Sequence, residues 1–289
     1  MYHTHCCVQL IYNSKYMIKL KEIVITSLFV ILFFNLSAQD SICINKSIKH
    51  VIHSKFLNED RDYWVSLPLH YTDSLKYPVI YVLDAEWRFE LTKTITFELG
   101  AWNKIQKSIV VGIPHIDWEN KRGQDLTFSQ SRIEYDGDIV DSTWYNKSNS
   151  GGAMKFYNYL TKELIPKINQ NYSTTGHETL VGHSYGGYFG GYILSLDHPF
   201  EVIHMYDPSI WFSDGEITNL FKKTDYNKPV NIHLTYQPKP KFHRKKIEEF
   251  IDELSKNSNI QLTTEFYEAE THNSLFLYSF YNGITKTNK

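Results

Sequence analysis

Cysteine is scarce in this chain, and its positions exclude a fold held together by internal disulfides. The 289 residues include three cysteines, of which Cys6 and Cys7 lie at the extreme N-terminus and the third is Cys43. A disulfide joins two cysteines, and the sequence from residue 40 to residue 289 contains only one. Stability must therefore come from a buried apolar core, for which residues 40–289 suffice as one domain.

An excess of charge of either sign is also lacking. The 30 Lys and Arg residues nearly balance the 32 Asp and Glu residues, which gives a formal net charge of −2. Without a strong positive field, nucleic acid is not expected as a partner. Aromatic residues, by contrast, make up 15% of the chain. They serve either as ordinary core and surface packing or as the lining of an aromatic pocket.

Only the N-terminal part of the sequence carries a long apolar run. Lys19 and Lys21 precede the apolar residues 23–36, and the small residues Ser37 and Ala38 follow. A basic segment, a short apolar core and a small-residue exit are typical of a secretory signal peptide. We therefore predict an N-terminal extension and signal over residues 1–39, with export to the periplasm or outside the cell. A buried helix and an uncleaved anchor are the alternatives, and after signal removal no stable membrane insertion is expected.

Residue types that bind metals gather in the first few positions of the chain, at His3, His5, Cys6 and Cys7. They lie upstream of Met17, a second candidate start that would give a signal of normal length. Because these residues precede any fold, we predict no metal site there. Neither a metal nor an organic cofactor is expected for this protein.

Strand-like and helix-like patterns alternate from residue 63 onward. Continuous β-branched and aromatic runs at 78–83 and 109–113 predict central strands buried on both faces. Apolar residues at helical spacing predict a helix over 153–169, which Pro166 ends or bends. Further strands are predicted at 63–69, 179–182, 202–205, 230–235 and 260–267, and further helices at 185–196 and 242–255. The alternation predicts an α/β fold with a mostly parallel central sheet and helices on both faces, with ligands at the carboxyl ends of the strands.

Residues 118–152 interrupt the alternation and show no clear element. An irregular segment of this length in a compact domain is either a functional lid or a mobile surface loop. As a lid, it would roof a pocket with its aromatic side chains, which are Trp118, Phe128, Tyr135, Trp144 and Tyr145.

The nucleophile is predicted from the pentapeptide Gly182-His-Ser-Tyr-Gly186, which matches the pattern G-x-S-x-G. In this pattern the serine occupies a strained turn from a strand to a helix, and the glycines leave room for the turn. A strand is predicted to end at Gly182 and a helix to begin at Tyr185, so the context fits. Ser184 is the predicted nucleophile, and a glycine-rich turn without chemistry is the alternative.

The general base and the acid must follow the nucleophile in the order Ser, acid, His. His272 comes after the last predicted strand and is the predicted base. His243 lies in a basic run, which we interpret as a solvated helix face, and the side chain of His183 is expected to point away from Ser184. Asp207 follows the strand at 202–205 and is the predicted acid, with the task of fixing the tautomer of His272. The alternatives are a Ser–His dyad or another carboxylate, namely Asp225, Glu248 or Glu270.

An oxyanion hole needs two N–H donors. The backbone of Tyr185, the residue after the nucleophile, is predicted to supply one donor. The turn after the strand at 78–83 is expected to supply the other, from either Ala85 or Glu86.

Taken together, these motifs resemble the Putative esterase family of α/β-hydrolases, which includes enterobactin-type siderophore esterases. The resemblance extends from about residue 61 to residue 274. The motifs that carry it are YPVIYVLDA at 77–85, VGIP at 111–114, Arg122 with DLT at 125–127, GGA at 151–153, ELIP at 163–166, GHSYGG at 182–187 and DPSIW at 207–211. The resemblance implies the α/β-hydrolase fold and a serine-dependent carboxylic ester hydrolase that works through an acyl-enzyme.

The chain departs from the family pattern at two positions that concern the acid. Asp207 stands where the family usually has Ser, and the residues QPKP at 237–240 replace a Gly-x-x-Glu sequence. We interpret this as an acid that has moved to the neighbouring strand, and loss of the acid is the alternative. An arginine that the family often has near Trp118 is absent, which weakens the case for a siderophore substrate.

The predicted substrate is a small-molecule ester of a siderophore, an aromatic acid or acetic acid. Arg122, Trp118 and Trp144 are the predicted substrate contacts. Two other functions stay open. One is a non-catalytic binding protein that retains the fold, which the missing carboxylate at 237–240 motivates. The other is a peptidase or thioesterase built on the same scaffold.

Overall fold

The computed structural model describes residue 19, residues 47–117 and residues 119–288. Apart from Lys19, the predicted signal peptide lies outside the described residues, as does its boundary at residues 39 and 40. The N-terminal His and Cys residues, Met17, Cys43 and Trp118 lie outside them as well. These predictions stay predictions. Within the described ranges, no helix is both long enough and apolar enough to cross a membrane.

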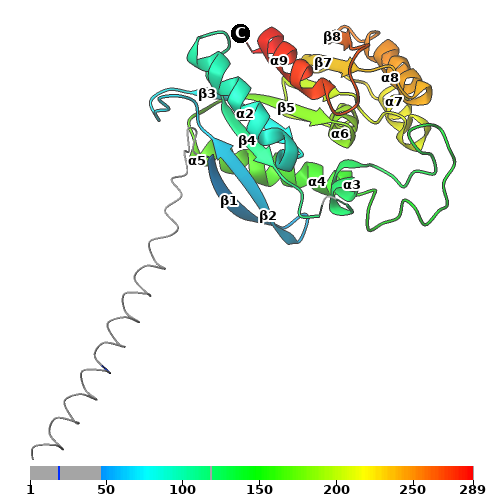
Figure 1. The fold of residues 1–289 in the computed structure, drawn as a ribbon, viewed down its shortest axis with the longest axis horizontal. Helices are drawn as coiled ribbons and strands as arrows, with labels where there is room; N and C mark the ends of the chain where they lie inside the picture. The colour runs from blue at the N-terminus through cyan, green and yellow to red at the C-terminus, as the bar shows by residue number, and fades with distance from the viewer. Residues whose placement is uncertain (1–18, 20–46, 118, 289) are drawn as a thin grey trace, which may run out of the picture. The chain divides into compact units, whose positions relative to one another are not determined.

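The described residues form one eight-stranded sheet in the order β1-β2-β4-β3-β5-β6-β7-β8 (Figure 1). The strands are β1 (Ser47–Ser54), β2 (Glu59–Ser66), β3 (Tyr77–Leu83), β4 (Ile109–Ile113), β5 (Thr174–His183), β6 (Val202–Tyr206), β7 (Val230–Tyr236) and β8 (Ile260–Phe266). Strand β2 runs antiparallel to β1 and β4, and the other neighbouring pairs are parallel.

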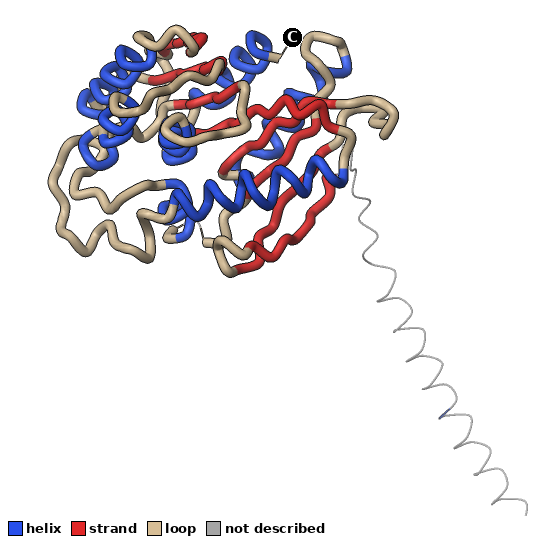
Figure 2. Tube along the Cα trace, turned by 180° about the vertical axis from the view of Figure 1, so that it is seen from behind, coloured by secondary structure: helices blue, strands red, loops and turns tan. Residues whose placement is uncertain are grey.

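Helices cover both faces of this sheet (Figures 1 and 2). They are α2 (Ala85–Ala101), α3 (Lys121–Leu126), α4 (Ala153–Tyr159), the π-helical turn η1 (Leu160–Leu164), α5 (Ile165–Asn171), α6 (Tyr185–Ile193), the 3₁₀ turn η2 (Phe212–Asp214), α7 (Glu216–Phe221), α8 (Lys241–Leu254) and α9 (Leu275–Thr287). Helices α2 and α9 contribute to one apolar cluster, and α4, α5, α6 and α8 contribute to the other. The predicted fold class, a mostly parallel α/β sheet with helices on both faces, is confirmed.

The sequence of β3 shows why the core has two layers. Successive side chains of a strand point to opposite faces, so Tyr81 and Leu83 join one cluster while Ile80 and Val82 join the other. All seven residues of β3 are buried. Its carboxyl end therefore lies at the centre of the sheet, where the site is built.

Several elements differ from those expected. Strand β1 and helices α2 and α9 were not predicted, and residues 118–152 contain the short helix α3. Helix α2 buries Thr92, Lys93 and Thr96 along with its apolar residues, so its buried face does not stand out as an apolar stripe. The helix expected over 153–169 is continuous to residue 171. Its π-helical turn η1 lies just before Pro166, because the proline ring needs room in the preceding turn.

Glu178 on β5 gives the fold a pH dependence. Its side chain is buried beside Asn169, and burial raises the pKa of Glu178 to about 7. Between about pH 4.5 and pH 7 the folded state then binds more protons than the unfolded state, so stability falls as the pH rises through this window, by about 3 kcal/mol. Glu178→Gln cannot ionise and should lose this slope. Urea denaturation at pH 5 and pH 8 measures the change in the free energy of unfolding. If this change were equal in the wild type and in Glu178→Gln, Glu178 would not be its source.

Candidate active site

Ser184 occupies a strained turn between β5 and α6. Its backbone dihedrals are φ 59° and ψ −118°, and a positive φ is costly for a residue other than glycine. Its N–H donates to the carbonyl of Tyr206 at 3.0 Å, which ties the turn to the end of β6. This geometry is the one that the G-x-S-x-G pattern predicts.

Glycines permit this turn through close backbone contacts. A Cβ atom added at Gly182 would lie 2.2 Å from the carbonyl oxygen of Gly186, a distance that no side chain tolerates. A Cβ atom added at Gly187 would lie 2.8 Å from Cβ of Pro208. Gly187 therefore lets the segment that carries Asp207 and Pro208 approach the start of α6.

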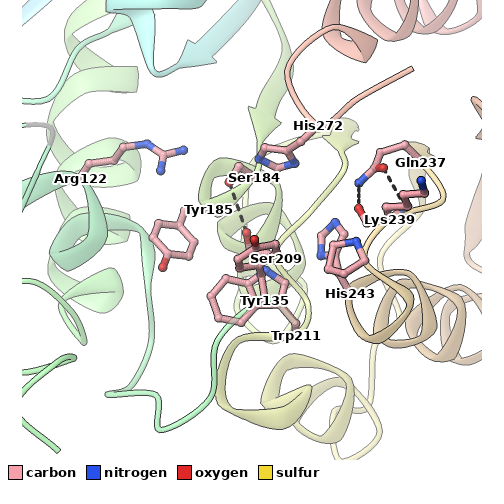
Figure 3. A pocket seen from close by; sticks show the side chains of 11 residues that line it. Arg122, Tyr135, Ser184, Tyr185, Ser209, Trp211, Gln237, Lys239, His243 and His272 are labelled. Atoms are coloured by element: carbon pink, nitrogen blue, oxygen red, sulfur yellow. Dashed lines mark hydrogen bonds between the residues drawn. The ribbon is translucent and has the colours of Figure 1, made fainter. Parts of the chain in front are cut away.

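The hydroxyl of Ser184 faces a pocket of about 390 Å³ (Figure 3). The pocket is lined by Arg122, Tyr135, Ser184, Tyr185, Ser209, Trp211, Gln237, Lys239, Pro240, His243 and His272. Ser184 and His272 are both among these lining residues (Figure 3). Ser184 Oγ lies 3.3 Å from Ser209 Oγ, so the serine hydroxyl has a polar neighbour within the pocket.

Asp207 and His272 meet at this pocket from different elements. Asp207 follows β6, and His272 lies in the loop between β8 and α9. His272 Nδ1 lies 2.7 Å from Asp207 Oδ2, and the Asp207 side chain is completely buried. Burial alone would raise the pKa of Asp207, but its contacts with His243 and His272 hold the pKa well below its usual value. Asp207 is therefore an anion placed to accept a hydrogen bond from Nδ1–H of His272.

Two further side chains contact the Asp207 carboxylate. The Gln237 amide donates to Asp207 Oδ2 at 3.0 Å, and His243 Nε2 lies 3.0 Å from Asp207 Oδ1. The interpretation of His243 as part of a solvated face is wrong, because its side chain is only 3% exposed. His243 begins the buried stripe of α8, followed by Ile247, Phe250 and Leu254. This helical spacing is the signal in the sequence that could have identified it.

His183 fixes the loop that carries His272. Its Nε2 lies 2.6 Å from the carbonyl oxygen of His272, and its Nδ1 lies 3.2 Å from the Arg88 guanidinium. The carbonyl needs a donor and the guanidinium needs an acceptor, so His183 is neutral with its proton on Nε2. Burial, followed by the charges of His272 and Arg88, lowers its pKa well below the usual value. No pattern in the sequence predicts this contact.

The candidate oxyanion donors lie in the first turns of two helices. Tyr185 is the first residue of α6, and Ala85 and Glu86 are the first two residues of α2. A helix provides no acceptor for the N–H groups of its first two residues. The N–H groups of the third and fourth residues of α2, Trp87 and Arg88, bond to the Asp84 carbonyl. The Glu86 carboxylate accepts from the backbone N–H of His115 at 2.6 Å, so its side chain is directed at that residue.

The predicted substrate contacts occupy different positions. Arg122 lines the pocket, but its guanidinium binds Asp84 through two bonds of 2.6 and 2.9 Å and stacks over the Tyr185 ring. Trp144 is 60% exposed and is not among the residues that line this pocket. Trp118 lies outside the described residues. The aromatic lining comes instead from Tyr135, Tyr185 and Trp211.

Comparison with known proteins decides the family. Residues 54–278 match the family model described as Putative esterase. The chain belongs to this family. Ferri-bacillibactin esterase BesA of Bacillus subtilis (strain 168) is 28% identical over 215 residues, which cover 68% of this chain and 72% of that protein.

Solved structures agree with this membership. An IroE-like serine hydrolase from Shewanella oneidensis is 28% identical with a TM-score of 0.74, covering 83% of this chain and 79% of its own. The BES protein from Bacillus cereus, at 22% identity and a TM-score of 0.73, shares the fold over 88% of this chain and 100% of its own. Membership in the Putative esterase family supports ester hydrolysis as the class of reaction.

The ion pair of Arg122 and Asp84 anchors this esterase's turn after β3. Asp84 has a left-handed backbone, with φ 54°, and is almost completely buried. Among the described residues, Arg122→Met would leave the Asp84 carboxylate with His115, at 3.3 Å, as its one remaining ion-pair partner. It should lower the free energy of unfolding by about 3–5 kcal/mol. Chemical denaturation measures this loss.

The double variant Asp84→Asn with Arg122→Met removes the buried charge together with its partner. It should therefore be less destabilised than the sum of the two single variants. If the effects were additive, the two side chains would not act as a pair.

Proposed function

We propose that this esterase is a serine hydrolase in which Ser184, His272 and Asp207 form the catalytic triad. The observation that carries the proposal is the contact of 2.7 Å between His272 Nδ1 and the buried Asp207 carboxylate, beside a serine in a strained strand-to-helix turn. A carboxylate at Nδ1 keeps the proton there, which leaves the Nε2 lone pair free to accept the proton of the nucleophile.

The reaction then proceeds in two halves. Ser184 Oγ attacks the ester carbonyl while its proton passes to Nε2 of His272, and the imidazolium donates that proton to the departing alcohol. Water repeats the sequence on the acyl-enzyme, which releases the acid and restores Ser184. The N–H groups of Tyr185 and of Ala85 or Glu86 stabilise the oxyanion in both halves. No step requires a metal or an organic cofactor.

The pocket favours an ester with an aromatic acyl group. Tyr135, Tyr185 and Trp211 present ring surfaces, and Lys239 adds a cation for an acidic substituent. The relative BesA is named a ferri-bacillibactin esterase, so an aromatic siderophore ester is the substrate class that we propose. The aromatic lining supports this class although the family arginine near Trp118 is absent. The smaller acetyl esters would leave most of this lining without a contact.

Replacement of Trp211 tests this specificity. Trp211→Ala should lower kcat/KM for an aromatic acyl ester by about tenfold and leave an acetyl ester with the same alcohol nearly unchanged. The matched control is Trp144→Ala, because Trp144 is exposed outside this pocket. Equal losses with both esters, or a loss in the control variant only, would contradict the proposed specificity.

We also propose that residues 1–39 direct export and are removed, and that residues 40–289 are the esterase domain. The alternative of a binding protein was motivated by the missing carboxylate at 237–240. Asp207 supports catalysis instead, because it brings a carboxylate to His272 from the neighbouring strand.

A further inference from the structure

One side of the Asp207 carboxylate has no aligned hydrogen-bond donor. Oδ2 accepts from Gln237 and contacts His272 Nδ1. Within the described residues, Asp207 Oδ1 has no hydrogen-bond partner, although His243 Nε2 lies only 3.0 Å away. Among the same residues, neither ring nitrogen of His243 has a hydrogen-bond partner, and its ring is buried. A buried polar atom without a partner is costly and calls for an explanation.

A bound cation explains this arrangement. One ligand atom each from Asp207, His243 and His272 lie within 4.8 Å of one another. Two imidazoles and one carboxylate are a common ligand set for zinc, with bonds of about 2.0–2.2 Å, so two ligand atoms of one ion lie about 3.3 Å apart. The distance of 3.0 Å between His243 Nε2 and Asp207 Oδ1 is close to this value. The full set spans up to 4.8 Å, so one imidazole must turn toward the other two ligands to complete the site. His243 and His272 line the pocket, which gives the ion a path and leaves a position for water.

We propose that Asp207, His243 and His272 form a binding site for Zn²⁺ or a similar transition-metal ion, and that occupation of this site switches the esterase off. The site itself is inferred from the three side chains alone. Its inhibitory effect rests on the proposed function, because only an enzyme that uses His272 as a base loses activity in this way.

The inhibition follows from the tautomer of His272. A metal ion bound at Nδ1 takes the lone pair of that nitrogen, so the single proton of the neutral imidazole must move to Nε2. Nε2, the nitrogen that takes the Ser184 proton in the proposed mechanism, is then a donor and cannot accept that proton. The ion also withdraws the Asp207 carboxylate from His272. No bond of the substrate is involved, so removal of the ion restores the enzyme.

Metal binding is tested first without any use of activity. Full-length Ser184→Ala, which keeps all three ligands, is stripped with a chelator and dialysed against Zn²⁺, beside the double variant Ser184→Ala with His243→Gln. The double variant should bind one Zn²⁺ fewer, or bind one ion at least about tenfold more weakly. The comparison between variants cancels any ion held elsewhere in the chain. Equal stoichiometry and equal affinity in the two proteins would overturn the site.

The matched control is His53→Gln in the same Ser184→Ala background. His53 also pairs with a carboxylate, that of Asp60 at 2.7 Å, but its side chain is 64% exposed. This variant should bind as many ions as its parent, and a loss here equal to that in the His243 variant would also overturn the site. His243→Asn replaces His243→Gln if the latter fails to fold.

Inhibition is then measured with the wild-type enzyme and a p-nitrophenyl ester. Zn²⁺ should abolish hydrolysis, the chelator should restore it, and His243→Gln should need at least about tenfold more Zn²⁺ for the same fractional loss. Zn²⁺ that binds through His243 without inhibition would overturn the switch. A wild-type protein that binds Zn²⁺ through His243 but hydrolyses no ester would keep the site and contradict the proposed function instead.

Discussion

Replacing Ser184 by alanine is expected to lower kcat for ester hydrolysis by at least about 10⁴-fold. Without Oγ no acyl-enzyme forms, and the residual rate comes from the oxyanion donors and from substrate binding alone. The loss is measured with a short p-nitrophenyl ester, together with the melting temperature, which should hardly change because alanine fits the space of serine.

Ser209 provides the matched control for this substitution. Its hydroxyl lies 3.3 Å from Ser184 Oγ in the same pocket, but it has no place in the proposed proton path. Ser209→Ala should lose less than about tenfold in kcat, the scale of one neutral hydrogen bond. If the two alanine variants lost activity equally, Ser184 would not be the nucleophile.

Asp207→Asn should lower kcat by up to about 10⁴-fold. An amide NH₂ facing Nδ1 of His272 favours the tautomer with the proton on Nε2, which is the wrong one for a base. The substitution keeps the size of the side chain, so substrate binding should change little and the effect should appear in kcat rather than KM. Steady-state kinetics at a fixed pH measure both constants.

The other carboxylates considered for this role supply the controls. Glu248 lies on α8, with 47% of its side chain exposed, and pairs with Arg244, whereas Glu270 accepts from Ser274. Glu248→Gln and Glu270→Gln should each change kcat by less than about threefold, as expected of surface groups. If Asp207→Asn lowered kcat by less than about threefold, Asp207 would not be the acid, and a Ser–His dyad would be the remaining interpretation.

The parts of the fold that could be predicted from sequence are those in which one residue pattern dominates. The buried run of β3 and the turn at Ser184 are local features, because burial on both faces and a strained turn each restrict the residues directly. Helix α2 could not be predicted in the same way, since it buries Thr92, Lys93 and Thr96. Tertiary contacts, rather than an apolar stripe, decide its buried face.

In the candidate site, too, local patterns predict some residues and tertiary contacts decide the others. Ser184, His272 and Asp207 could each be placed at the end of a strand, and parallel strands bring their carboxyl ends together. The choice of Asp207 over other carboxylates depends on a contact between residues 65 positions apart. His243 was missed because its basic neighbours suggested a solvated face, whereas its spacing to Ile247 and Phe250 places it on the buried side of α8.

Labelling with a fluorophosphonate, a reagent that modifies an activated serine, tests the central claim most directly. Wild-type protein should gain one adduct, which peptide mass spectrometry locates at Ser184, and labelling should be much slower in Asp207→Asn and absent in Ser184→Ala. Ester hydrolysis that persists while Ser184 stays unlabelled, or an adduct on another residue that accounts for the loss of activity, would contradict a serine hydrolase mechanism at this site.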